Sequence, residues 1–430
     1  MANEYYSTLY SMNFRIIVDK VKTITISPGD VVSLMISNDY DRSTYPIIRL
    51  RIYSDLSVIQ SIAEYPDALE LRAAVTGGIY QMSTDQTPRL IKPTKGFDFS
   101  AKIYLEYKNI PTSPMDQYQN GLPRSLNEDL NTENKVPIEL YCYDDTTIHR
   151  MKDQPPAIYK DMTIETVTRS MFNYCSIQKY AIEPFTNSKK YDQIMIPNLN
   201  MIDALSYFDK TYGLYPKGAG LYEDLYGFDN RIVIYNLDTN NYFVSSRGRS
   251  IPIYVNSYSN DSDMGGMKKI QDVSSGKSDY YLETKYDNVS VMTESDIAKV
   301  LNAEYLESVN INTLKVSFSK VFTDLQNYTF NQSAETYISP DCILHKYLSE
   351  YVTETVIARL NEQVTRIDVS GVGFDVEYFN PMSRFNLIFE SPIRGINMAD
   401  KYRPIFINNV FNSIGNDLFI ASTTMRLCKN

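Results

Sequence analysis

The stretch Phe97-Asp98-Phe99-Ser100-Ala101-Lys102-Ile103-Tyr104-Leu105-Glu106-Tyr107 places apolar side chains at its odd-numbered positions and polar or amphipathic ones between them. Successive residues of a β-strand point to opposite faces, so this period of two predicts a strand with one buried and one exposed face. A half-buried strand needs a sheet and a second layer to complete its core. The stretch therefore predicts that the N-terminal region contains a β-barrel or β-sandwich.

Shorter runs with the same period precede it. Residues 23–26 alternate threonine and isoleucine, and the Ser-Pro-Gly-Asp sequence at 27–30 predicts a turn. Residues 48–53 alternate aliphatic side chains with arginine and tyrosine. Gly77-Gly78 lies between two such runs and predicts a hairpin turn. The N-terminal region is therefore predicted to be rich in strands.

The middle of the chain changes character. Residues 111–136 are rich in Pro, Asn, Gln, Asp and Ser, which predicts a long loop or a domain boundary. Residues 137–143 follow as a predicted strand. The next region has helical spacing, through the apolar positions Ile164, Val167, Met171 and Cys175.

A second helix has clearer end signals. Asn200 is a favourable N-cap with Asp203 three residues later, and Gly213 is placed to end the helix with Leu214 in contact after it. Its predicted buried stripe consists of Ile202, Leu205, Phe208 and Tyr212. Residues 221–226 and 231–237 then predict a hairpin. This part is predicted to be a small α+β unit.

The C-terminal part returns to strands after a polar segment. Residues 257–279 predict a second long loop, and helices are predicted from Thr293 and from Ser339, the latter with Pro340 in its first turn. Strands are predicted at 367–369 and 385–389. Residues 412–416 predict a turn into an alternating strand at 419–427. Strand-rich ends thus flank an α+β middle.

Composition narrows the possible functions. The chain has 430 residues, enough for two or three domains, and a net charge of −10. Its longest cationic runs are two residues, Lys189-Lys190 and Lys268-Lys269, which argues against a dedicated nucleic-acid binder. Residues 1–10 lack the pattern of a signal peptide, and no apolar run approaches the ~18 residues of a membrane span. A protein that is made and stays soluble in a cytoplasm is expected.

Tyrosine is abundant, with 36 Tyr beside 18 Phe and no Trp. Its amphipathic ring suits surfaces that become buried against other proteins. An AT-rich coding genome also favours tyrosine codons, so composition alone leaves both explanations open.

The residues that could carry chemistry are few. Two histidines, His149 and His345, are a poor supply for acid–base or metal chemistry. The four cysteines lie far apart, at Cys142, Cys175, Cys342 and Cys428. Cys342 and His345 are three positions apart on a predicted helix, but nothing nearby completes a tetrahedral metal site, so core packing is the ordinary interpretation.

Other motifs are incomplete. Asp261-Ser262-Asp263 lacks the later ligands of a calcium loop, and Gly371-Val372-Gly373 lacks the third glycine of a dinucleotide fingerprint and is interpreted as a bulge or kink. No phosphate-binding loop or serine-nucleophile elbow is present. Among 52 carboxylates no spacing singles out a pair for glycoside hydrolysis. We therefore expect no enzyme, and we assign no catalytic, cofactor-binding or metal-binding residue.

Three segments together carry a resemblance to a known family. They are the capped helix region Ile196-Pro197-Asn198-Leu199-Asn200-Met201-Ile202-Asp203-Ala204-Leu205-Ser206-Tyr207-Phe208-Asp209-Lys210-Thr211-Tyr212-Gly213-Leu214-Tyr215 with its following hairpin, residues 385–427, and Tyr45-Pro46-Ile47-Ile48. As a set they resemble baseplate hub proteins in the tails of large phages. The resemblance in organisation covers most of the chain.

The resemblance implies an α+β, mainly β fold with two tail-tube-like β-barrels flanking a small α+β insertion. The first barrel is expected at residues 1–130, the insertion at 131–245, and the second barrel with helices at 246–430. Three copies are expected to form a ring with pseudo-sixfold symmetry. The implied partners are the tail tube and tube-initiator proteins, the central spike protein and the tape measure, with DNA passing through without specific binding.

The implied location is the virion tail baseplate, assembled in the host cytoplasm. The acidic balance agrees with a DNA conduit, because negative walls repel phosphates, although a pI near 5.0 is common among soluble proteins. Other classes stay open: another baseplate or tail-completion protein, a receptor-binding tail protein, and a glycan-cleaving hydrolase. The absence of tryptophan argues weakly against sugar stacking in a receptor-binding protein.

Overall fold

The computed structural model describes residues 5–40, 46–55, 62, 64–65, 68–82, 88–104, 135–143, 147, 152–215, 218–224, 231–237, 250–255, 267–271, 278–291, 315–317, 335–337, 365–376, 379, 381–389 and 401–429. The strands of its largest sheet are β1 (Tyr5–Val18), β2 (Lys22–Ile26), β3 (Val31–Asp39), β4 (Ile47–Asp55), β5 (Leu69–Met82), β6 (Arg89–Tyr104), β7 (Lys135–Tyr143), β13 (Ser250–Val255), β14 (Met267–Gln271), β15 (Ser278–Val291), β18 (Thr365–Val372), β19 (Arg384–Phe389), β20 (Lys401–Gly415) and β21 (Leu418–Lys429). The remaining elements are β8 (Ile158–Thr163), α4 (Ile164–Tyr174), β9 (Tyr180–Ile182), β10 (Lys190–Met195), α5 (Met201–Tyr212), β11 (Ala219–Asp224), β12 (Arg231–Asn236), β16 (Lys315–Ser317), β17 (Glu335–Tyr337) and the 3-10 turn η1 (Pro28–Asp30).

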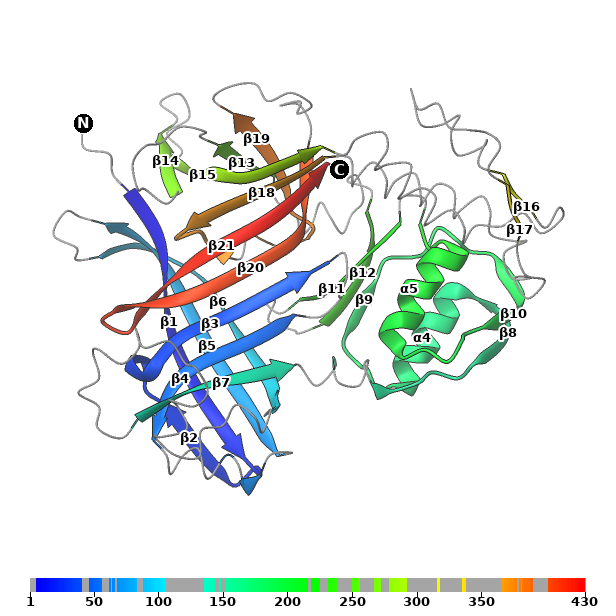
Figure 1. The fold of residues 1–430 in the computed structure, drawn as a ribbon, viewed down its shortest axis with the longest axis horizontal. Helices are drawn as coiled ribbons and strands as arrows, with labels where there is room; N and C mark the ends of the chain where they lie inside the picture. The colour runs from blue at the N-terminus through cyan, green and yellow to red at the C-terminus, as the bar shows by residue number, and fades with distance from the viewer. Residues whose placement is uncertain are drawn as a thin grey trace.

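The pairings of the 14-stranded sheet include two large closed circuits within the described residues, and β14 also links β15 to β1. The first circuit runs through β1, β5, β6, β7, β4, β3, β20 and β21 and returns to β1. The second circuit runs through β13, β15, β18, β21, β20 and β19 and returns to β13. The hairpin β20–β21 is common to both circuits and crosses the molecule between them (Figure 1).

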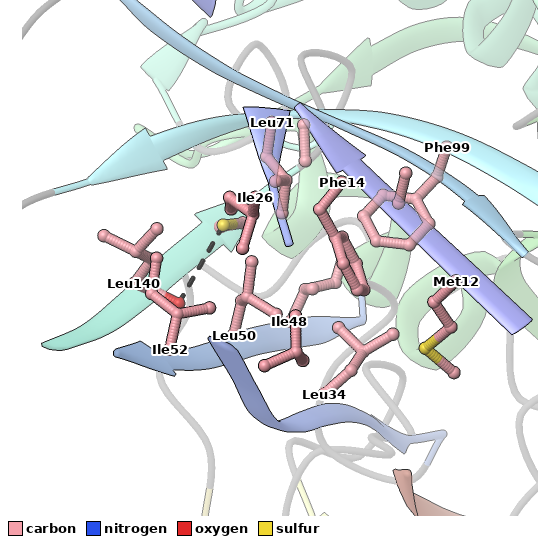
Figure 2. Close-up of a cluster of buried hydrophobic side chains, with 14 of the residues drawn as sticks. Met12, Phe14, Ile26, Leu34, Ile48, Leu50, Ile52, Leu71, Phe99 and Leu140 are labelled. Atoms are coloured by element: carbon pink, nitrogen blue, oxygen red, sulfur yellow. Dashed lines mark hydrogen bonds between the residues drawn. The ribbon is translucent and has the colours of Figure 1, made fainter. Parts of the chain in front are cut away.

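The first circuit encloses an apolar core, which follows from the period-two pattern of its strands. Figure 2 shows Phe14, Leu34, Ile48 and Leu71 converging on this core from four strands. In β6, Phe97, Phe99, Ala101 and Ile103 are buried, whereas Asp98, Ser100 and Lys102 are exposed. The alternation expected for this stretch is therefore confirmed up to Tyr104, where the described part of the strand ends.

The expected hairpin turn at Gly77-Gly78 is wrong. Both glycines lie inside β5, where Gly77 is paired with Tyr10 of β1 and Thr94 of β6. A Cβ atom at Gly77 would lie 2.3 Å from the Thr94 hydroxyl oxygen, and one at Gly78 would lie 2.5 Å from a methyl carbon of Leu90. These glycines therefore serve close side-chain packing within a long strand, a role of strand glycines that resembles a turn signal in sequence.

Residues 257–279 are not one long loop. β14 lies within this range and pairs antiparallel with β15, from Met267 opposite Leu282 to Gln271 opposite Ser278. The polar composition predicted a loop because the strand is short and carries Lys268 and Lys269, which are more typical of exposed edges.

Two further boundaries differ slightly from expectation. Val136 belongs to β7 rather than to the preceding loop. The last hairpin turns at Asn416 and Asp417, with φ of 51° and 58°, so Asn412 still lies in β20. Asparagine and aspartate tolerate this left-handed conformation. The Asn and Ser residues just before it are also typical of turns, so the sequence places the end of the strand too early.

The inserted unit follows β7 and contains α4, α5 and the small sheets β8–β10 and β11–β12–β9 (Figure 1). Helix α5 begins as predicted, because the Asn200 side chain accepts a hydrogen bond from the Asp203 amide at 2.9 Å, and at the start of α4 the Thr163 side chain accepts one from the Thr166 amide. Gly213 ends α5 with φ of 63°. The β11–β12 hairpin pairs as expected.

The predicted stripe of α5 needs one correction. Leu205, Phe208 and Tyr212 are buried, but Ile202 is only partly buried. Met201 and Ala204 are fully buried, so the buried face is turned by about one position toward the start of the helix. Side chains of a helix point toward its N-terminus, which shifts the covered surface in this direction.

The described residues form an α+β, mainly β protein, as the sequence predicted. The helices expected from Thr293 and Ser339, the loop at 111–134, and residues 225–230 between the two strands of the predicted hairpin lie outside the described residues.

Candidate assembly site

The shared hairpin β20–β21 joins the two ends of the chain. β21 pairs antiparallel with β1 at Leu9 opposite Ile420, and with β18 from Arg366 opposite Cys428 to Val372 opposite Ser422. β20 pairs with β3 and β19 on its other side. A closed circuit satisfies backbone hydrogen bonds on both sides of its strands. The hairpin therefore joins the first and last strands into one continuous sheet.

A segment after β18 fills the gap where β1 and β21 diverge. Gly373, with φ of 75°, donates its amide to the Ala421 carbonyl at 2.8 Å and accepts a hydrogen bond from the Thr8 amide at 2.7 Å. A Cβ atom there would lie 2.7 Å from the Ser7 hydroxyl oxygen. Gly373 therefore bridges two strands of the closed sheet, in line with the bulge or kink that its sequence suggested.

Tyr10 fixes the same segment from inside the first circuit. Its ring is fully buried and meets Phe411 edge-on, with centroids 5.1 Å apart. Its hydroxyl accepts a hydrogen bond from the Val376 amide at 2.9 Å and donates one to the Phe374 carbonyl at 3.3 Å. The buried Tyr10 hydroxyl and the backbone groups of Phe374 and Val376 beside the core are therefore all hydrogen-bonded.

The inserted unit attaches through a small apolar cluster. Met382, in the turn before β19, packs with Tyr222, Val233, Tyr235 and Leu237 of the inserted unit. The Tyr235 hydroxyl donates to the Pro381 carbonyl at 3.3 Å. Gly220 stands opposite Tyr235, and a Cβ atom there would lie 2.3 Å from the tyrosine ring, so only glycine leaves room for it.

Two polar contacts lie at this junction, one within the turn before β19 and one to β11 of the inserted unit. Arg384 is almost fully buried, and its Nη1 donates to the carbonyls of Pro381 and Ser383 at 3.0 and 3.1 Å. Thr147 donates to Glu223 of β11 at 2.7 Å, and both side chains are buried. Buried charged groups are retained when they are hydrogen-bonded, because an unpaired one is costly. The junction is therefore specific rather than a loose contact.

The interior of the inserted unit holds several titratable groups without a reactive arrangement. Burial raises the pKa of the Tyr159 hydroxyl to about 12, with smaller contributions from the nearby Cys175 and Tyr174, and raises the pKa of the Cys175 thiol to about 11, with a smaller contribution from Asp153. Burial also raises the pKa of Tyr215, whose hydroxyl donates to the Glu183 carbonyl at 2.6 Å. These groups stay protonated at neutral pH and act in packing, because nucleophilic reactivity needs the deprotonated form.

The residues that the sequence singled out for chemistry fall into two groups. His149, His345, Cys342 and Asp261-Ser262-Asp263 lie outside the described residues. Cys142, Cys175 and Cys428 are free and buried. Within the part of the chain that the structure describes, no three His, Cys, Asp or Glu side chains are grouped to hold a metal ion.

Sequence reasoning missed the residues that join the parts. Tyr10, Met382 and Arg384 carry no motif, because their partners lie far away in the chain. A signal did exist at Gly220, because a glycine within a strand indicates a close approach of another group, as the sequence already indicated at Gly373.

Large apolar side chains are exposed at several separate places. They include Leu90 and Ile91 at the start of β6, the cross-strand pair Ile158 and Met195, and Tyr174 at the end of α4. Single exposed apolar residues are common, but adjacent ones indicate a surface that contacts another molecule. These places are candidates for assembly contacts.

No helix in the described part of the chain has both the length and the apolar character needed to cross a membrane.

The closed sheet, its shared hairpin and the inserted unit define a mainly β protein with two strand circuits in one chain. The chain belongs to the family of the bacteriophage PBS1 gene 109 protein, whose family model matches residues 5–424. The resemblance to proteins of large phages is thus confirmed at the level of the family. Among curated proteins, none is significantly similar to the chain.

Solved structures that match the chain include phage tail proteins and a component of a secretion system. A tail protein from Neisseria meningitidis MC58 is 12% identical with a TM-score of 0.46, over 98% of this chain and 97% of that chain. The 43 kDa tail protein of prophage MuSo2 from Shewanella oneidensis is 9% identical with a TM-score of 0.44, over 96% of each chain. The E. coli c3393 protein, a component of the type VI secretion system, is 8% identical with a TM-score of 0.45, over 93% of this chain and 74% of that chain.

Proposed function

We propose that this chain is a non-catalytic structural protein of the virion, the hub of a phage tail baseplate that links the tail tube to the central spike. The observation that carries the proposal is the pair of closed strand circuits that share one hairpin, in a chain that belongs to a phage family. Each circuit is proposed to act as one tube-like barrel.

Two barrels in one chain give a physical route between two symmetries. Three copies, each contributing two similar barrels, present six barrel positions to a sixfold tube and three equal positions to a trimeric spike. The shared hairpin β20–β21 supports this proposal, because strands common to both circuits hold the two barrels at a fixed relative orientation. A ring built this way needs obligate interfaces, which typically bury roughly 2,000 Å² or more.

The other proposed contacts follow from the same position. The tube-initiator and tube proteins dock on one side of the ring, the spike on the other, and the tape measure passes through the centre. Net charge of −10 supports a conduit that does not hold passing DNA, because like charge repels phosphate. The protein is proposed to assemble in the host cytoplasm before it enters the virion.

The decisive experiment is reconstruction of the phage particle with this chain located in it. We expect three copies around the tail axis, between tube and spike. Six copies around the axis, or a position on a peripheral fibre, would reject the hub and favour another baseplate component or a receptor-binding protein.

A catalytic role has its own test. The purified chain is expected to leave peptidoglycan and other glycans intact. Clearing of a cell-wall substrate, lost when one pair of acidic residues is replaced by amides, would establish a hydrolase instead.

A further inference from the structure

The first residues of β6 form a cationic segment in an acidic protein. Residues 89–95 read Arg-Leu-Ile-Lys-Pro-Thr-Lys, and we name them the basic edge segment. The segment carries Arg89, Lys92 and Lys95 and no acidic side chain. Because the whole chain has a net charge of −10, the remainder is more acidic still. The segment is therefore positively charged, whereas the rest of the chain has a net negative charge.

The basic edge segment is open to solvent on both faces. Leu90 is 51% exposed and Ile91 is 44% exposed, and Arg89, Lys92, Pro93 and Lys95 are exposed as well. Ile91 is the extra residue of a β-bulge opposite Ile79 and Tyr80, whereas Lys92 and Pro93 are consecutive in the regular ladder and so expose both faces of the strand. Further along the same strand, from Phe97, every second side chain is buried. The segment thus lacks the one-sided burial that explains apolar residues elsewhere in β6.

The segment also lies at an edge of the sheet. β6 pairs with β5 along its length, but among the described residues it pairs with β7 only from Lys102 to Tyr104. Residues 89–95 therefore have a strand on one side alone within that part of the chain. Pro93 offers no amide hydrogen for a further strand, which is typical of an edge and favours docking through side chains over continuous strand addition.

We propose that the basic edge segment is the surface on which a second copy of this chain docks. Charge complementarity selects the occupant, since another copy presents a predominantly acidic surface. A twofold axis running through the segment would oppose like charges, so we expect the segment to contact a different, acidic surface of the second copy. Heterologous contacts close into a ring when the rotation between successive copies closes, as the ring of the proposed function requires. The inference rests on the proposed function for its geometry, and it adds the surface that the ring uses.

The apolar residues fit this occupant better than nucleic acid. A segment that binds single strands combines cations with aromatic rings on which bases stack, and the basic edge segment has none. Leu90 and Ile91 instead supply the apolar centre of a small protein contact, with the cations around them at the rim. Rim charges accelerate association and fix orientation.

The experiment uses the full chain with a photo-reactive amino acid in place of Ile91, both as purified protein and inside assembled tails. We expect a crosslinked product of twice the 49.5 kDa chain mass, with mass spectrometry joining residues 89–95 to a different region of a second copy. In the purified protein its yield is expected to fall on dilution, and also in 1 M salt, which shortens the screening length to about 3 Å. The same probe at the exposed Lys152 is the control and is expected to give no such product.

A charge-reversal pair tests the electrostatic part. Arg89→Glu with Lys92→Glu is expected to weaken self-association by roughly tenfold or more. Lys152→Glu with Lys401→Glu makes the same change in net charge at other exposed cations and is expected to leave association unchanged. Circular dichroism and thermal melting of each pair confirm that both variants fold.

Each other outcome overturns the inference. The first is a crosslink from residue 91 to another protein or to DNA, and the second is the absence of a two-chain product in both preparations. The third is an equal loss of self-association in both charge-reversal pairs. The fourth is a DNA mobility shift that the Arg89→Glu and Lys92→Glu variant abolishes. Failure of the proposed function is distinguishable from these. If residue 91 crosslinks copies of the chain that lie on a peripheral fibre, the hub is rejected and the docking surface stands.

Discussion

The strand circuits are held together by contacts between residues far apart in the sequence, whereas the inserted unit is held together by contacts between residues much closer in the sequence. The core of the first circuit gathers residues from Tyr10 to Ala421, and the hydrogen bonds of Tyr10 span 364 and 366 residues. The core of the inserted unit is made by residues between Tyr159 and Ile234. Its helix pair Glu165 and Arg169 is four residues apart, with an Nη2–Oε1 distance of 2.9 Å.

The difference teaches how the two parts depend on the rest of the chain. Closing a long loop costs conformational entropy before any distant contact can form, so parts with local contacts fold sooner. The inserted unit can assemble from its own sequence, whereas the strand circuits need β1 and β21 together. We therefore expect changes at the C-terminus to damage the circuits selectively, and changes in α5 to damage the inserted unit selectively.

The largest effect is expected from removing residues 416–430, which contain β21. This deletion opens both circuits and takes away the fully buried side chains of Phe419, Ala421, Met425 and Leu427. Each large apolar residue contributes roughly 2–5 kcal/mol, and their sum reaches the ~5–15 kcal/mol stability of a typical protein. The strand circuits should not fold, while residues 152–237 keep their structure.

Hydrogen exchange read by mass spectrometry measures this directly. In the truncated chain, peptides from β1 and β5 should exchange at the rate of an unfolded chain, and peptides from α4 and α5 should remain protected. A control that lacks only residues 429–430 should show the pattern of the whole chain. Protection of β1 in the truncated chain would show that the circuits do not depend on the shared hairpin.

A smaller loss of stability, located in the inserted unit instead of the strand circuits, is expected from Leu205→Asp in α5. Leu205 is 3% exposed, and a buried carboxylate without a partner costs several kcal/mol. The inserted unit should lose its fold while the circuits stay closed. Ile202→Asp, three positions earlier and only partly buried, is the matched control and should cost much less. Thermal unfolding followed in the two regions by hydrogen exchange compares them, and unchanged melting of Leu205→Asp would place the helix on the surface.

The same contrast explains what could be predicted from the sequence. The inserted unit was largely predictable because its signals are local: Asn200 caps α5, Gly213 ends it, and both act on neighbours within a few residues. The strand character of β6 was predictable for the same reason, from its period of two. In the inserted unit, however, the predicted buried face of α5 is wrong by one position. Met201 and Ala204 face the core, and the spacing of apolar residues alone does not show which side of the helix faces it.

The closure of the sheet could not be predicted in this way. Nothing near Leu9 or Ile420 indicates that β1 and β21 are partners, because a pairing is a property of two distant segments. The sequence predicts a turn at Gly77 and Gly78 because the side chains that require glycine there, those of Tyr10 and Leu90, come from other strands. The junction residues Met382 and Arg384 were missed for the same reason. Helices and strands can therefore be predicted from local sequence patterns, whereas the candidate site depends on how distant strands and helices come together.

The smallest effect concerns an ion pair of the circuits at low pH. On β5, Arg72 Nε lies 2.7 Å from Glu70 Oε1, and the Ser100 hydroxyl of β6 donates to the same oxygen at 2.5 Å. The hydrogen bond from Arg72 lowers the pKa of Glu70 below its ordinary value of 4.5, burial partly opposes this, and Ser100 lowers it further. A lowered folded-state pKa stabilises the fold above pH 4.5, and this stability is lost as the pH falls from 4.5 through the lowered value.

Glu70→Gln should therefore flatten the dependence of stability on pH in that acidic window and leave the region 152–237 unaffected. The change is expected to be small, because the Arg72 side chain is 60% exposed and solvent screens such a pair. Arg72→Gln removes the main cause of the lowered pKa and should flatten the same window, with Ser100→Ala giving a weaker version of the effect. Chemical denaturation at a series of pH values from 3 to 6 measures it. Equal pH dependence in the parent and in Glu70→Gln would mean that the Glu70 pKa is the same in the folded and unfolded chain, and that acid acts on the circuits through other carboxylates.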